Sequence, residues 1–151
     1  ATAARSIEWG TLTVIACAVG LEAAITHSGL AAQIAHLLNL AGGNDPMLAL
    51  TTVFLGGTLI TNIITNNAAA AFMFPIAYAS AKQLGVNFMP FAIVLMVAAS
   101  CAFITPTGYQ TNMMVWSAGG YRFTDFIKIG LIMTVILCAA TLVITPLVFP
   151  F

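Results

Sequence analysis

Residues 58–67 read TLITNIITNN and place six uncharged polar side chains, all Thr or Asn, within ten positions. This stretch lies in the middle of a run from 46 to 81 that contains no charged residue. A straight helix over that whole run would be about 54 Å long, whereas the hydrocarbon core of a bilayer is about 30 Å thick. The run therefore has to fold back, and the sequence predicts a re-entrant helical hairpin with Thr65, Asn66 and Asn67 at its tip.

The composition restricts the chain to a lipid environment. Of the 151 residues, 61% are hydrophobic and 5% are charged, and the formal net charge is zero. Soluble domains are about 25% charged, so this chain cannot cover itself with a water-facing surface, which excludes a soluble enzyme. Four Lys and Arg residues cannot form a basic face for phosphates, which excludes a nucleic-acid-binding protein. The sequence contains no nucleophile triad, paired carboxylates or metal-ligand pattern, so we expect no enzyme activity and no cofactor.

A second uncharged run, from 83 to 121, is also too long for one membrane helix. Its apolar first part, 88 to 104, is followed by TPTGYQTN at 105–112. Pro106 removes a backbone donor and Gly108 relaxes the restriction on φ, so a helix is expected to unwind there. The sequence predicts a helix that is broken within the membrane.

Each interruption would place a helix N-terminus at membrane depth. The second half of the broken helix is expected to begin near Gln110 or Thr111, and the return arm of the hairpin at Ala68. Free N–H groups at such termini attract anions, and carbonyls freed by a break attract small cations. The pattern thus predicts an ion site without a charged side chain. The alternative is structural, with Asn and Thr bonding neighbouring helices around a Pro-Gly kink.

The remaining segments complete an all-α polytopic membrane protein. A first span is predicted near 9 to 27, a short amphipathic helix along the interface from 28 to 40, and a last span within 129 to 151. With the broken helix, this makes about three transmembrane helices, one re-entrant hairpin and one interfacial helix. Glu22 lies inside the first span, where a snorkelling or hydrogen-bonded carboxylate and a proton-coupling role are the two interpretations.

Three stretches resemble the C-terminal half of the divalent-anion:sodium symporter family, within the superfamily of citrate-transporter-like permeases. They are SGLA at 28–31, TNIITNNAAAAFMFPIA at 61–77 and SCAFITPTGYQTNMMV at 100–115, and GGYRFTDF at 119–126 resembles the sulfate-permease-like branch. The resemblance implies that 1–151 is a single transmembrane transport domain, the second of two inverted repeats of an elevator-type transporter. It also implies a homodimer in the lipid bilayer and an N-terminal repeat, missing here, that supplies the rest of the site.

The resemblance also implies which residues bind the transported ions. Contacts with the substrate anion are expected from the hairpin tip and the broken-helix loop: Thr65, Asn66, Asn67, Gly108, Tyr109, Gln110 and Thr111. Sodium would be held mostly by backbone carbonyls and one Asn side chain: Thr61, Ile64, Asn66 and Gly108.

Two departures from the dicarboxylate carriers of that family affect the expected substrate. Asn67 stands where those carriers have Thr, and Tyr109-Gln110 stand where they have Thr-Pro. We therefore expect a secondary active transporter of the plasma membrane, the inner membrane in bacteria, that couples Na⁺ to a small anion such as sulfate or a di- or tricarboxylate. The alternatives are coupling to H⁺, an arsenite-type carrier of the same superfamily, or a membrane scaffold that transports nothing.

Overall fold

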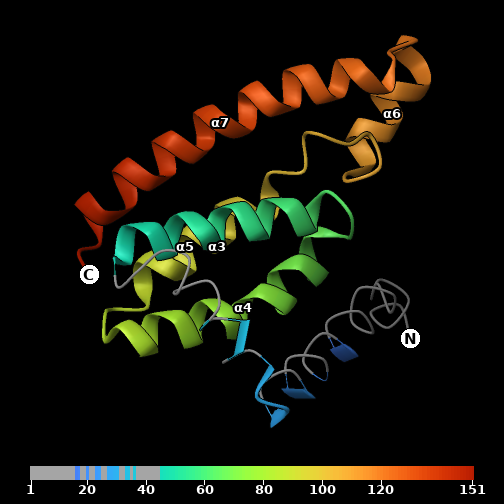
Figure 1. Cartoon of the computed structure of the whole chain (residues 1–151). Coiled ribbons are helices and arrows are strands. Elements are labelled where there is room, and N and C mark those ends of the chain that lie inside the picture. Colours follow the sequence, from blue (N-terminus) through green and yellow to red (C-terminus); the bar gives the residue numbers. More distant parts are fainter. Residues whose placement is uncertain are drawn as a thin grey trace, which may run out of the picture.

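The computed structural model describes a continuous C-terminal part of the chain and a few residues before it: 45–151, together with 16–17, 20, 23–24, 27–30, 33–34 and 36. Over 45–151 every regular element is an α-helix, in agreement with the all-α prediction (Figure 1). Most of the expected first span and interfacial helix, and Glu22, lie outside the described residues.

Helices α3 (Pro46–Thr61) and α4 (Asn66–Leu84) fold back on each other as a hairpin (Figure 1). Helix α3 begins where the Asp45 carboxylate accepts a hydrogen bond of 2.9 Å from the backbone N–H of Met47. The fold-back thus occurs inside the uncharged run, as the polar stretch indicated, and the turn between the helices is formed by residues 62–65.

The predicted start of the hairpin's second helix is wrong by two residues. Helix α4 begins at Asn66, two residues before the predicted Ala68, because the Thr65 hydroxyl accepts a 3.4 Å hydrogen bond from the Ala68 N–H and caps the helix. Asn66 and Asn67 therefore belong to the first turn of α4 and not to an irregular loop. Their backbone N–H groups are directed out of the helix start, toward the turn.

The broken helix consists of α5 (Met89–Ser100) and α6 (Gln110–Gly119), separated by nine residues without helical structure. The start of the second half at Gln110 confirms the prediction. The first half ends four residues before Ile104, where the apolar pattern stops. Its end is earlier because side chains from outside the helix bind the backbone that follows Ser100.

Helix α7 (Phe123–Val148) is the one helix in the described part that is long and apolar enough to cross a membrane, with 26 residues and a mean hydropathy of 2.5 over its most apolar 18 residues. It begins six residues before the uncharged run, where the Asp125 carboxylate accepts a 2.9 Å bond from the Arg122 N–H. Its outer surface is Leu, Ile and Val, which is the arrangement of a helix in lipid. The buried positions on this helix are all small or polar: Gly130, Thr134, Thr141 and Thr145.

Helices α3, α4 and α5 pack around one apolar core, and α7 lies against α3 and α5 on the side away from α4 (Figure 1). Phe54 and Phe91 are fully buried in this core. Helices α3 and α5 approach closely at Gly57, where a Cβ would lie 3.0 Å from the Ala98 Cβ. This close approach brings the hairpin turn next to the end of α5, where the break begins.

Candidate ion-binding site between the hairpin turn and the helix break

Asn62 joins the hairpin turn to the break. Its side-chain nitrogen donates to the carbonyls of Thr58, at 2.8 Å, and Cys101, at 3.1 Å. Its side-chain oxygen accepts from the N–H groups of Ile104, at 3.0 Å, and Thr105, at 3.2 Å. The Thr105 hydroxyl donates in return to the Asn62 carbonyl at 2.8 Å. Asn62 is only 8% exposed, and its bonds satisfy backbone groups of the turn and the break that are buried or partly buried.

Asn112, in the first turn of α6, covers the same segment from the other end. Its side-chain nitrogen donates to the carbonyl of Ala102 at 2.7 Å and to that of Thr105 at 3.3 Å. Together with Cys101, three carbonyls freed by the break are thus already bonded to asparagine side chains. The carbonyls available for a cation are therefore fewer than the break alone suggests.

Three oxygens, from Thr61, Asn66 and Ala99, lie close together beside the hairpin turn, and only one hydrogen is available between them. The fully buried Thr61 hydroxyl lies 2.8 Å from the side-chain oxygen of Asn66 and 2.6 Å from the carbonyl of Ala99. A hydroxyl carries a single proton, so it can donate to only one of these two acceptors at a time. Two arrangements satisfy the set: the Asn66 amide is rotated so that its nitrogen donates to Thr61, or a cation takes the place of the missing proton.

A polar cavity of about 260 Å³ opens between the start of α4, the end of α5, the break and the start of α6. Neither α4 nor α6 has an acidic residue in its first turn, so the positive end of each helix dipole is unopposed within its own helix. Such a cavity suits an anion held by neutral donors. It is lined by Asn66, Ser100, Ala102, Phe103, Tyr109, Thr111 and Asn112.

The predicted substrate residues divide into three groups. Asn66, Tyr109 and Thr111 line this cavity together, although they are up to 45 positions apart in the chain. Thr65 and Asn67 are exposed beside Asn66, without lining the cavity. Two more predicted residues stand at the other end of the break, where Gly108 precedes the helix and Gln110 begins it.

Of the predicted sodium ligands, Thr61 and Asn66 are in contact through their side chains. Ile64 is exposed in the hairpin turn. A Cβ at Gly108 would lie 3.0 Å from the Thr105 hydroxyl, so glycine is suited to this crowded position. Within 45–151 no hydrogen bond joins Ile64 or Gly108 to the first pair. The complete sodium set stays a prediction.

Sequence reasoning missed the roles of Asn62, Asn112 and Ala99. Asn62 and Asn112 belong to the polar stretches, but a sequence does not distinguish an asparagine that binds a ligand from one that bonds the backbone of another segment. Ala99 contributes its carbonyl, so its residue type carries no signal at all.

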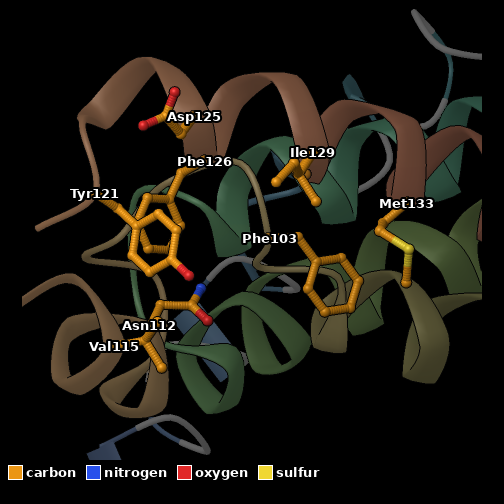
Figure 2. A pocket seen from close by; sticks show the side chains of 9 residues that line it. Phe103, Asn112, Val115, Tyr121, Asp125, Phe126, Ile129 and Met133 are labelled. Carbon is orange, nitrogen blue, oxygen red and sulfur yellow. The ribbon is translucent and has the colours of Figure 1, made fainter. Parts of the chain in front are cut away.

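A second cavity, of about 250 Å³, lies between α6 and α7 (Figure 2). Tyr121 and Phe126 close one end of it, with ring centroids 6.2 Å apart and an edge-to-face arrangement. Phe103 and Asn112 line both cavities, so the two cavities adjoin at the break and the start of α6. The walls are mostly apolar, and the Asp125 carboxylate already accepts from the backbone, so this cavity is not suited to an ion.

The chain is helical and almost uncharged, and it has an outward-facing apolar helix. It also has a polar cavity where two helical segments are interrupted. This combination is typical of a membrane transport protein. Residues 2–151 match the family model described as citrate transporter. The chain belongs to this family, whose members are transporters and not enzymes, and it is an integral membrane protein.

The chain is also similar to individual transporters. It is 43% identical over 145 residues to an uncharacterised transporter of Synechocystis, covering 95% of this chain and 24% of that protein. It is 36% identical over 132 residues to a probable sodium/sulfate cotransporter of Chlamydomonas reinhardtii, covering 85% and 14%. It is 25% identical over 127 residues to a sodium-dependent dicarboxylate transporter of Staphylococcus saprophyticus, covering 84% and 24%. The chain thus spans about a quarter or less of the length of these relatives. The bacterial relatives indicate the inner membrane.

Proposed function

We propose that this chain is the second repeat of a secondary active transporter that carries a small divalent or trivalent oxyanion together with sodium by alternating access of the elevator type. The observation that supports this most is the cavity in which Asn66 of the hairpin meets Tyr109 and Thr111 of the broken helix. The first repeat, elsewhere in the full-length protein, would complete the site, and two copies would form a homodimer. Sodium-coupled anion transport is thus proposed for the full-length protein, and it is tested there.

The anion would be bound by neutral donors. Asn66, Tyr109 and Thr111 line the cavity, and N–H groups at the starts of α4 and α6 would supply further donors to the anion. Thr65, Asn67, Gly108 and Gln110 would complete the contacts from adjacent positions. Sulfate is favoured because the relative named for sulfate is more similar to this chain than the one named for dicarboxylate.

The cation would bind where Thr61, Asn66 and Ala99 contribute three oxygens that share one proton. Uncharged oxygens of this kind suit sodium, and carbonyls from Ile64 and Gly108 would complete the coordination. A cation here would hold the Asn66 amide in one orientation, which pre-forms the anion cavity beside it. Coupling then follows, because each ion improves the site of the other.

The proposed membrane topology follows from helix lengths. Helix α3 has 16 residues and measures about 24 Å, too short to cross a core of about 30 Å. The hairpin of α3 and α4 would therefore enter and leave on one side. The broken helix and α7 would each cross the membrane, together with the first span near 9 to 27, and 28 to 40 would lie along the interface.

Thiol labelling tests whether the two ends of the cavity are reached by water. Both Thr65 and Thr111 are exposed, so Thr65→Cys and Thr111→Cys should react with a membrane-impermeant thiol reagent. We expect sulfate plus sodium to slow labelling of both at least tenfold, while choline chloride leaves it unchanged. Thr51→Cys, near the opposite end of α3, is the control that substrate should not protect. Inaccessibility of both positions under every condition would favour a scaffold that transports nothing.

Replacing sodium distinguishes the coupling ions. Uptake of labelled sulfate into proteoliposomes should fall to background when choline replaces sodium at constant pH and membrane potential. A carrier coupled to protons would instead retain uptake in choline and lose it when the pH gradient is collapsed. An arsenite-type carrier would show arsenite movement that sulfate does not inhibit.

A further inference from the structure

The break in the second uncharged run begins before the residues that sequence reasoning held responsible for it. Helix α5 ends at Ser100, whereas Pro106 and Gly108 lie six and eight positions later. Pro106 deletes the bond that its own N–H would make to Ala102, and its ring disfavours the helical conformation of Thr105, whose N–H would donate to Cys101. Neither effect extends back to the first non-helical residue, Cys101. A different group must open the helix at that earlier turn.

The Asn62 side-chain amide lies between the N–H of Thr105 and the carbonyl of Cys101. In a continuous helix the Thr105 N–H would donate to the Cys101 carbonyl, four residues back. Here the Thr105 N–H donates to the Asn62 side-chain oxygen, and the Asn62 side-chain nitrogen donates to Cys101. A side chain inserted into the helical ladder in this way is a recognised cause of helix interruption.

The insertion leaves Asn62 without capacity for a ligand. Both of its amide hydrogens face carbonyls and both acceptor positions of its oxygen face N–H groups. Rotating the amide by half a turn would oppose oxygen to oxygen and N–H to N–H, so its orientation is determined. Asn112 acts similarly one residue on, because it donates to the Ala102 carbonyl, to which Pro106 has no N–H to donate.

We propose that Asn62 is the positioning residue that opens the broken helix and ties it to the hairpin turn, so that the two halves of the ion cavity form one rigid unit. The segment that Asn62 holds open carries Ala102 and Phe103, which line the cavity. Without this amide the segment would lose its anchor, and the cavity would lose one wall. The consequence for transport rests on the proposed function, but the consequence for the local structure does not.

Cys101 reports the local structure, because its thiol is 1% exposed and the Asn62 amide binds its backbone. In full-length protein with every other cysteine replaced, Asn62→Ala should raise the rate of Cys101 alkylation by N-ethylmaleimide at least tenfold. Asn87→Ala is the matched control, since Asn87 is exposed and its side chain accepts a 3.0 Å bond from the Met89 N–H at the start of α5, the end remote from the break. It should leave the rate unchanged.

A buried reporter elsewhere separates local release from general unfolding. Ser80 is 1% exposed and its hydroxyl has no hydrogen-bond partner in the structure, so Ser80→Cys removes no bond. In a Cys101→Ala background, this thiol should stay unreactive in the Asn62→Ala protein. An unchanged Cys101 rate would overturn the proposal. The proposal would also be overturned if the alkylation rates of Cys101 and of the Ser80→Cys thiol rose equally, both in Asn62→Ala and in the isosteric Asn62→Asp. Asn62 would then stabilise the fold in general.

Transport provides the functional readout. Asn62→Ala should raise the KM for the anion at least tenfold with little change in kcat, because the cavity is misplaced and the moving domain is intact. If Cys101 responds as expected while the unmodified protein carries no anion, the positioning role stands and the proposed function fails.

Discussion

Asn66→Ala should abolish sodium-dependent anion uptake by the full-length transporter. Within residues 45–151, Asn66 is the residue that both lies 2.8 Å from the buried Thr61 hydroxyl and lines the polar cavity, so its removal should weaken both proposed ion sites. A hydrogen bond to a charged group contributes about 1.5–3 kcal/mol, and the loss of two such contacts corresponds to about 10²-fold or more in affinity. Uptake of labelled sulfate into proteoliposomes measures the effect.

The variant should still fold, because the Thr61 hydroxyl keeps the Ala99 carbonyl as its acceptor at 2.6 Å. Asn87→Ala offers the same chemical change at an exposed asparagine and should transport normally. Normal uptake by Asn66→Ala, at normal protein levels in the membrane, would show that this residue is not part of the site.

Gly130→Val should cause the largest loss of stability. A Cβ at Gly130 would overlap the carbonyl oxygen of Phe103 and would lie 2.8 Å from the Cα of Ile104. These neighbours are backbone atoms, so no side-chain rotation relieves the overlap, and α7 has to move away from the break. Overpacking of this kind costs about 1–3 kcal/mol and occasionally more. Thermal unfolding of the purified transporter in detergent, followed by tryptophan fluorescence, measures the loss.

The matched control is Ala140→Val, a comparable change at an exposed position of the same helix. It should alter the free energy of unfolding by less than about 0.5 kcal/mol. Equal stability of the two variants would mean that α7 does not support the break through Gly130.

Part of the candidate site could be predicted from the positions of polar residues alone. Asn66, Tyr109 and Thr111 were expected in one site and line one cavity, because each lies at the interruption of a run too long for one helix. The start of α4 was misjudged by two residues, because the capping bond from Ala68 to Thr65 competes with the irregular turn that the polar residues suggested. The end of α5 was misjudged because the side chain that binds the backbone beyond it, Asn62, lies in the hairpin turn, about 40 positions earlier in the chain.

The sequence by itself determined the solvent and the number of interruptions, because the scarcity of charge and the lengths of the uncharged runs are properties of the chain and of a bilayer of known thickness. Only the tertiary structure decided which asparagines face the ion cavity and which satisfy the opened backbone. Asn62 and Asn66 are the same residue type four positions apart, at the two ends of the hairpin turn. Their surroundings differ because α3 and α5 pack closely enough to bring Cys101 and Thr105 to Asn62. A hydrogen bond needs its partner within about 3 Å, and that distance is set by packing between helices that are remote in the chain.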